Sequence, residues 1–262
     1  MTTATDPLDF SGKVVIVTGG CRGVGRGITE RFLGAGADVL VCCRNEPDTR
    51  PASDGREATF VAADVRDPDQ IDTVIAATIE RFGRLDVLVN NAGGSPPADT
   101  ATASPKFSTA IINLNLIAPL VFAQRANSIM QEQPDGGVII NIASVSGTRA
   151  NPEAAAYGAA KAGLLNVTET LGVVFAPQVR VVGVIAGMIV TEQARFFYGD
   201  EEGIAAVGAT VPAGRMAYPD DIGDACLFLA SSLARYITGT SLTVHGGGEV
   251  AAYIDASKNR SE

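Results

Sequence analysis

Short runs of β-branched and aliphatic residues alternate with helical stretches along this chain, and the alternation limits the possible folds more than any other feature. Several runs are uninterrupted Val, Ile and Leu, as in strands covered on both faces. Alternating β and α units favour a parallel sheet with right-handed crossovers. We predict strands at residues 13–18, 38–43, 59–62, 86–90, 138–142, 179–185 and 241–244. We predict helices at about residues 24–33, 69–82, 107–131, 154–175 and 220–229.

The 262 residues show no repeat and no linker that would divide them, so we predict a single domain spanning residues 1–262. Two connecting segments are long. Residues 44–58 are polar, and residues 191–215 contain the aromatic run Phe196-Phe197-Tyr198. The second segment is interpreted as a substrate-binding lid, or alternatively as a surface helix pair that packs its own aromatic side chains.

Charge and composition exclude several classes of partner. The formal net charge is −9, which disfavours nucleic acid and anionic membranes. We find no signal peptide at the N-terminus and no apolar run of the ~20 residues that a membrane span needs, so we expect a cytoplasmic protein. A single histidine, His245, argues against multi-histidine metal sites, and we predict no metal. The four cysteines, Cys21, Cys42, Cys43 and Cys226, are interpreted as small buried hydrophobes in a reducing compartment.

A glycine-rich turn follows the first predicted strand and leads directly into a helix. Its spacing is Thr18-Gly19-x-x-x-Gly23-Val24-Gly25. Glycines let backbone N–H groups approach a pyrophosphate, and a helix N-terminus adds positive partial charge. Such turns also occur for packing reasons, but the position after the first strand favours a dinucleotide.

The end of the second strand bears on the choice of dinucleotide. An acidic residue there would bind the ribose hydroxyls of NAD, whereas arginine accommodates the 2′-phosphate of NADP. The strand ends at Arg44, and Arg22 lies in the glycine turn, so two guanidiniums favour NADP. Glu46 lies nearby and keeps NAD possible, and Arg44 can alternatively be a solvated loop residue.

Tyr157 and Lys161 are four residues apart near the start of a predicted helix, so they share one helical face. A neighbouring cation favours phenolate and lowers the pKa of tyrosine from about 10. The phenol would then exchange a proton with the substrate oxygen during hydride transfer. Ser144 ends a strand thirteen residues earlier and can donate to the reacting oxygen. Ser146 is the second candidate, and turn capping is the alternative role for both serines.

With these motifs in order, the chain resembles the short-chain dehydrogenase/reductase family, in its single-domain subgroup of about 250 residues. The resemblance covers about residues 8–248. Beyond the glycine turn, Ser144 and Tyr157-x-x-x-Lys161, it rests on Asp64-Val65, Asn90-Asn91-Ala92-Gly93, and Asn115-Leu116 followed by Ala118-Pro119. It implies an α/β, Rossmann-type doubly wound fold with a seven-stranded, mostly parallel sheet and helices on both faces.

The resemblance also implies roles for individual residues. Ser144 would orient the substrate, Tyr157 would be the general acid/base, Lys161 would bind the nicotinamide ribose, and Asn115 would hold a water that relays protons. A helix-interior amide bonding its own backbone is the other reading of Asn115. The remaining residues implied to bind the cofactor are Thr18, Gly19, Arg22, Gly23, Val24, Gly25, Arg44, Asp64, Val65, Asn91, Ala92, Gly93, Gly187, Ile189 and Thr191.

The chain departs from the family pattern at two places. Gly183 and Ala186 stand where the family has Asn and Pro, and we expect the second change to loosen the segment over the nicotinamide. His245 replaces a family Asp, and we interpret it as structural. Residues 239–248 resemble the family's last strand, which commonly packs in a tetramer interface, so we expect a homotetramer or dimer.

The leading prediction is an NADP-dependent oxidoreductase that interconverts a small carbonyl compound and its alcohol. The alternative is a catalytically silent, redox-sensing protein that only binds a dinucleotide, although such a protein would not need the acid/base group. Residues 131–135, expected beside the site mouth, are acidic or neutral, which argues against an acidic acyl carrier protein. The aromatic run 196–198 favours a largely apolar substrate.

Overall fold

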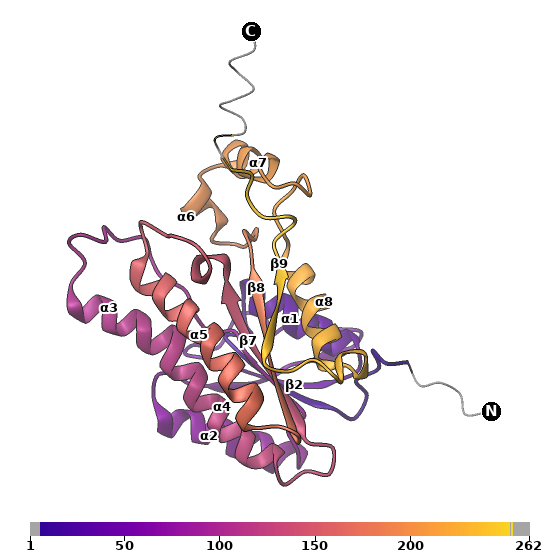
Figure 1. The fold of residues 1–262 in the computed structure, drawn as a ribbon. Helices are drawn as coiled ribbons and strands as arrows, with labels where there is room; N and C mark the ends of the chain where they lie inside the picture. The colour runs from indigo at the N-terminus through magenta and orange to yellow at the C-terminus, as the bar shows by residue number, and fades with distance from the viewer. Residues whose placement is uncertain (1–5, 252, 254–262) are drawn as a thin grey trace.

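A computed structural model describes residues 6–251 and residue 253 (Figure 1). Its centre is a seven-stranded parallel sheet in the order β5-β2-β1-β6-β7-β8-β9. The strands are β1 (Val14–Thr18), β2 (Asp38–Cys43), β5 (Thr59–Ala62), β6 (Val87–Asn90), β7 (Gly137–Ser144), β8 (Val179–Ala186) and β9 (Thr240–Val244). The Val- and Ile-rich runs form these strands because both faces of the sheet are covered. The predicted seven-stranded α/β fold is confirmed.

Helices cover both faces of the sheet (Figure 1). On one face α1 (Gly23–Gly34) packs against α8 (Pro219–Ala230), and their apolar side chains meet β1, β7 and β8. On the other face lie α2 (Pro68–Phe82), α4 (Ala118–Met130) and α5 (Ala155–Val174). Asp67 caps α2 by accepting from the backbone N–H of Asp69, and α2 ends at Gly83 in the left-handed conformation. Three-residue 3₁₀ turns lie at Val145–Gly147 and Ser232–Ala234.

The strand order fixes where a ligand can bind. From β1 the chain proceeds outward through β2 and β5, then returns to the other side of β1 and continues through β6, β7, β8 and β9. Ligands of open α/β sheets bind at the carboxyl ends of the strands beside such a reversal. Thr18, Asn90 and Ser144 end β1, β6 and β7 and therefore lie at this edge.

The two long connecting segments contain short elements that the sequence did not predict. Residues 44–58 include the two-residue strands β3 (Ala52–Ser53) and β4 (Arg56–Glu57), which pair antiparallel. Residues 191–215 include α6 (Ala194–Tyr198) and α7 (Glu201–Ala209), which stand beyond the carboxyl edge of the sheet (Figure 1). The segment thus contains two short helices, and its role as a substrate-binding lid stays a prediction.

Residues Pro105–Met130 form a helical stretch whose length and apolar composition alone would allow a membrane span. The sequence analysis did not identify this stretch as a possible span. In the structure it is a series of three elements: α3 (Pro105–Ile112), a π-helical turn (Asn113–Ile117) and α4. The side chains of Phe122, Ala126 and Met130 are buried against the sheet. We therefore assign this segment to the core of the domain.

Candidate active site

The glycine turn after β1 is shaped by close backbone contacts. Gly19 has a φ of +64°, in the left-handed region that favours glycine. A Cβ on Gly25 would lie 2.9 Å from the carbonyl carbon of Gly19, so the first turn of α1 can fold over the strand end only with glycine there. Asn91 donates from its side-chain amide to the carbonyl oxygen of Thr18 at 2.8 Å. The Thr18 hydroxyl accepts from the N–H groups of Asn91 and Ala92 at 2.9 Å each. The predicted residues of this region are therefore gathered around the end of β1.

The N-terminus of α1 already receives an anionic group from the protein. The backbone N–H of Gly23 donates to the Glu192 carboxylate at 3.3 Å. Arg22, the residue before the helix, has no side-chain capping bond and is exposed. A carboxylate at this position shows that the turn accepts a negative charge, as a pyrophosphate site must. The glycine cradle and this contact together fit a dinucleotide, which would be held by Gly19, Gly23 and the first turn of α1.

Basic side chains gather beyond the ends of β2 and β5. Arg44 is exposed and close enough to Asp64 to help lower the pKa of that carboxyl, after the larger effect of the hydrogen bond from Arg66. Arg66, which the sequence analysis missed, donates from Nε to Asp64 at 2.9 Å. Val65, the residue between Asp64 and Arg66 in the chain, is buried. The sequence motif included only Asp64 and Val65, so Arg66 is recognised from its position in the structure.

The acidic residue that kept NAD possible has a partner of its own. Glu46 accepts two hydrogen bonds from Arg50, at 2.6 and 3.2 Å. Its carboxylate is therefore engaged within the loop that follows β2, whereas no ion pair of Arg22 or Arg44 occurs within the described residues.

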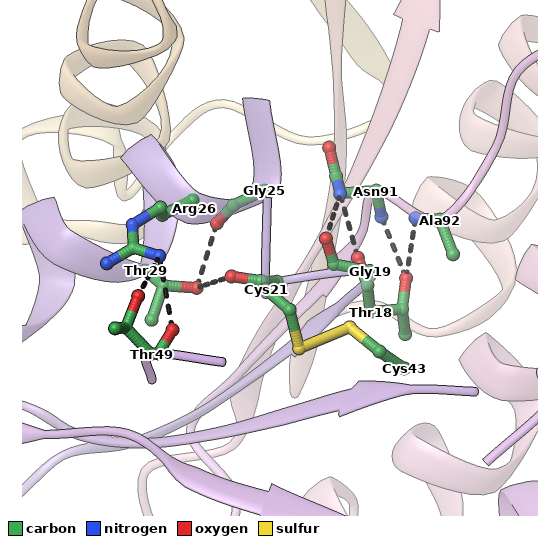
Figure 2. Close-up of a disulfide and its surroundings, with 11 residues drawn as sticks. Thr18, Gly19, Cys21, Gly25, Arg26, Thr29, Cys43, Thr49, Asn91 and Ala92 are labelled. Carbon is green, nitrogen blue, oxygen red and sulfur yellow. Dashed lines mark hydrogen bonds between the residues drawn. A yellow bond between two sulfur atoms is a disulfide. The ribbon is translucent and has the colours of Figure 1, made fainter. Parts of the chain in front are cut away.

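Cys21 and Cys43 form a disulfide, so the expectation that all four cysteines are reduced is wrong for this pair (Figure 2). Cys21 lies in the glycine turn and Cys43 is the last residue of β2. Cys42 and Cys226 are free and buried, as expected. The sequence analysis overlooked that the ends of adjacent parallel strands bring residues 22 positions apart together.

Ser144, Tyr157 and Lys161 converge at the carboxyl end of β7. The Ser144 hydroxyl lies close enough to the Tyr157 phenol to act toward lowering its pKa. The Nζ atom of Lys161 lies 5.6 Å from the centroid of the Tyr157 ring and donates to the carbonyl oxygen of Ile142 at 2.7 Å. Ser146 instead accepts from the Asn151 amide at 2.9 Å, and its N–H donates to the Ser144 hydroxyl at 3.1 Å. The structure thus brings together the Ser, Tyr and Lys that the sequence singled out.

Burial dominates the ionisation of this cluster. It raises the pKa of the Tyr157 phenol above its ordinary value of 10.0, although the Ser144 hydroxyl acts in the opposite direction. Burial also lowers the pKa of the Lys161 ammonium from 10.5 to about 8. The predicted lowering of the Tyr157 pKa is therefore wrong for the protein alone, because desolvation outweighs the lowering effect of Ser144.

Asn115 is completely buried in the π-helical turn. Its amide donates to the carbonyl oxygens of Gly94 at 3.0 Å and Ile111 at 2.9 Å, and its Oδ1 accepts from the Gly94 N–H at 2.8 Å. It therefore bonds both its own helix and the strand-end segment. A Cβ on Gly93 would lie 2.7 Å from Oδ1 of Asn115 and 3.4 Å from Nζ of Lys161, so a glycine there keeps this space open.

The end of β8 and the segment that follows it make close contacts with neighbouring parts of the chain. A Cβ on Gly183 would meet the Ser241 Cβ at 3.0 Å, which explains why no larger residue stands there. Gly187 donates to the carbonyl oxygen of Val244 at 2.9 Å. Ile189 pairs with Ala217 in an isolated bridge. This segment is therefore tied to its neighbours despite Ala186 in place of proline.

Thr191 follows directly and lies beside the glycine turn. Its side chain is 3.6 Å from the position of a Cβ on Gly23. A cavity of about 550 Å³ extends from Thr191 along α6 and α7, where Arg195, Ile204 and Met216 line it. Phe196 and Phe197 contact each other edge to face, with centroids 5.3 Å apart, and are exposed. Tyr198, the last residue of α6, lies near Tyr157.

Comparison with known proteins gives this geometry a family. The family model described as enoyl-(acyl carrier protein) reductase matches residues 19–249. The chain belongs to the short-chain dehydrogenase/reductase family. It is 36% identical to the 3-oxoacyl-[acyl-carrier-protein] reductase of Escherichia coli K12, over 92% of this chain and 98% of the relative. It is 34% identical to an L-rhamnose 1-dehydrogenase (NAD(P)(+)) of Azotobacter vinelandii, over 90% of this chain and 96% of that protein.

A solved structure supports the same assignment. The ligand-free aldohexose dehydrogenase of Thermoplasma acidophilum superposes with a TM-score of 0.85 and 31% identity, covering 91% of this chain and 94% of that one. The short-chain dehydrogenase/reductase described here is accordingly an oxidoreductase acting on alcohol or carbonyl groups. The family resemblance noted from the motifs is confirmed.

Proposed function

We propose that this short-chain dehydrogenase/reductase transfers a hydride between NADP(H) and a small carbonyl or alcohol compound, with Tyr157 as general acid/base. The observation that carries the proposal is the convergence of Tyr157 with the Ser144 hydroxyl and the Lys161 ammonium at the carboxyl edge of the sheet. Dinucleotide-binding proteins without an enzymatic role do not need a phenol, a hydroxyl and an ammonium so arranged, so the silent alternative is disfavoured.

The bound nicotinamide supplies or accepts the hydride, and the side chains manage the proton. Because burial keeps the pKa of Tyr157 above 10.0, its phenol is protonated at neutral pH, the form that carbonyl reduction requires. Ser144 donates a hydrogen bond to the reacting oxygen. Lys161 binds the nicotinamide ribose and places a positive charge beside the phenolate that forms. Asn115 holds the water through which that ammonium exchanges protons.

The cofactor preference follows from charge at the adenosine end. Arg22 and Arg44 are exposed and lie beyond the ends of β1 and β2. Neither forms an ion pair within the described residues, while Glu46 bonds Arg50 and Asp64, the acid near Arg44, bonds Arg66. Two guanidiniums suit a phosphate, which they can bind bidentately. Asp64 and Val65 hold the adenine, while Asn91, Ala92 and Gly93 line the cleft. Gly187, Ile189 and Thr191 receive the carboxamide.

The argument against an acyl carrier protein does not hold. The segment 131–135 precedes β7, whereas Ser144 ends β7, so the two lie at opposite edges of the sheet. Asp135 is also paired with Arg84 and Lys13. The charge of this segment therefore says nothing about the mouth of the site. We retain small carbonyl compounds as the leading substrate class and include a thioester in the test.

The test separates cofactor binding from chemistry. NADPH and NADH binding are measured by nicotinamide fluorescence, and turnover on a panel of sugars, apolar ketones and a 3-oxoacyl thioester. Tyr157→Phe should lose at least about 100-fold in kcat and keep its NADPH affinity. Tyr236→Phe, a change at a fully exposed phenol, is the control. Unchanged turnover in Tyr157→Phe would refute the mechanism.

The same assay tests the cofactor preference. Arg22→Ala combined with Arg44→Ala should weaken NADPH binding by at least about 100-fold, because hydrogen bonds to charged groups contribute about 1.5–3 kcal/mol each. NADH binding should change little. Arg56→Ala, on the same loop but paired with Asp38, is the matched control. Tighter binding of NADH than NADPH to the unmodified protein would contradict the preference.

We also propose that the protein is a homotetramer or dimer and that it is cytoplasmic. Light scattering measures the mass of the assembly in solution and tests the oligomeric state.

A further inference from the structure

The disulfide Cys21–Cys43 joins the glycine turn to the end of β2 (Figure 2), the two segments proposed to bind the adenosine end of the cofactor. β1 and β2 are parallel neighbours with Thr18 paired to Cys42, so the turn after β1 passes the end of β2. The two Cα atoms are 6.6 Å apart, within the range of protein disulfides. The bond therefore links two segments that the sheet already holds in register.

The fold singles out one cysteine pair among four cysteines. Cys42 is adjacent to Cys43 but points to the opposite face of the sheet, as successive strand residues must. Cys42 and Cys226 are fully buried, and burial raises the thiol pKa of both, to about 12 for Cys42. Cys43 is only partly buried, so a small molecule can reach this pair from solvent.

The bridge spans the gap between the two arginines assigned to the ribose phosphate. Arg22 follows Cys21 directly, and Arg44 follows Cys43 directly. A second link ties the same two segments, because Arg26 of α1 donates to the carbonyl oxygen of Thr49 at 3.2 Å (Figure 2). With the bond formed, the turn and the strand end cannot separate, and two sulfur atoms fill the space between them.

We propose that Cys21 and Cys43 are a reversible thiol switch: the dithiol form binds NADP(H), and the disulfide form closes the adenosine end of the site. The inference rests on the proposed function for its ligand, and its trigger is a hydroperoxide. Thermodynamic linkage makes the effect reciprocal: the free energy by which the disulfide weakens NADP(H) binding equals the free energy by which bound NADP(H) disfavours formation of the disulfide.

The chemistry balances with hydrogen peroxide as the oxidant. The Cys43 thiolate attacks one peroxide oxygen, the O–O bond breaks, and water leaves after protonation, giving a sulfenic acid. The Cys21 thiolate then attacks the Cys43 sulfur, the S–S bond forms, and the S–O bond breaks to release a second water. Two thiols thereby lose two electrons and two protons, and the peroxide is reduced to two waters. A dithiol reductant reverses the step by thiol–disulfide exchange.

The experiment compares NADPH binding before and after oxidation of the full chain. Reduced protein is titrated with hydrogen peroxide, linked peptides are mapped by mass spectrometry, and the NADPH Kd is measured by fluorescence. We expect a Cys21–Cys43 peptide and an NADPH Kd raised about 5- to 150-fold, the usual span of coupling between sites. Dithiothreitol should restore the Kd, and saturating NADPH should slow the loss of the two thiols.

Variants identify the responsible thiols. Cys21→Ser and Cys43→Ser should each show the same NADPH Kd before and after peroxide, whatever that Kd is. Cys226→Ser, which removes a buried thiol elsewhere, should respond as the unmodified protein does. Equal NADPH affinity of the dithiol and the mapped disulfide would overturn the gate, and so would the absence of the linked peptide. Failure of both forms to bind NADPH or NADH would instead refute the proposed function, and the peptide map would still decide whether the bridge forms.

Discussion

Lys161 should lower the stability of the protein at neutral pH, and replacing it by Met should expose this cost. The Lys161 side chain is 3% exposed. Its ammonium donates a hydrogen bond to the carbonyl oxygen of Ile142, which carries no charge. Burial lowers its pKa from 10.5 to about 8. At 1.36 kcal/mol for each pKa unit, this difference corresponds to about 3 kcal/mol.

The sign follows from proton binding. Below pH 8 both the folded and the unfolded chain carry the proton, and the folded state bears the full desolvation cost. Between the folded pKa of about 8 and the unfolded value of 10.5, the unfolded chain binds more protons, so stability rises with pH. Lys161→Met removes this titration but leaves the Ile142 carbonyl without a donor, at a cost of about 1–3 kcal/mol.

Urea unfolding followed by circular dichroism at pH 7, 8, 9 and 10 measures the effect. At pH 7, Lys161→Met should be as stable as the unmodified protein or up to about 2 kcal/mol more stable. That difference should shift by about 2–3 kcal/mol in favour of the unmodified protein by pH 10. Lys106→Met, at an exposed position of α3, is the control and should show no such shift. Parallel stability profiles for Lys161→Met and the unmodified protein would refute the reasoning.

Two further substitutions test the packing that positions the site. Gly27→Ala should lower the free energy of unfolding by about 1–3 kcal/mol, because the added Cβ would lie 2.7 Å from the carbonyl carbon of Pro219 where α1 meets α8. Gly34→Ala, at the exposed end of α1, is the control and should lower it by less. Equal losses for the two variants in urea unfolding would contradict this prediction. Asp86→Asn should cost about 1–3 kcal/mol, because the buried carboxylate accepts from Val14 N–H at 2.9 Å and pairs with Arg84 and Lys13. Asp72→Asn, whose carboxylate is half exposed, is its control, and thermal melts that shift alike would count against the prediction.

The strands were predictable because each is a short, locally encoded run. β2 and β5 begin and end at the predicted residues, and the others differ by at most two residues at either end. The bounds of α6 and α7 were not predicted, although Asp200 followed by Glu201 and Glu202 is an N-terminal signal that the sequence displays. Strands β3 and β4 have two residues each, too few for any periodic pattern, and a contact between Arg56 and Asp38 supports them.

The cluster of Ser144, Tyr157 and Lys161 was predictable from the sequence, but the pKa values of its members were not. Tyr157 and Lys161 lie one helical turn apart in any α-helix, so their proximity is a local property. Their pKa values depend on how much water the surrounding segments exclude, which sequence spacing does not encode. The π-helical turn likewise depends on a distant contact, since Asn115 bonds Gly94 from another part of the chain. Arg66 and the Cys21–Cys43 pair also follow from topology, through the ends of neighbouring strands.

The two ends of the site have different physical characters, and this difference separates their functions. At one end Lys161 forms no ion pair within the described residues, and burial lowers its pKa to about 8, a cost of about 3 kcal/mol. At the other end Arg22 and Arg44, the residues proposed to bind the 2′-phosphate, are exposed to solvent. A bond between the neighbouring cysteines changes the second end without touching the first. Oxidation should therefore alter the KM for NADPH while leaving kcat at saturating cofactor close to that of the reduced enzyme.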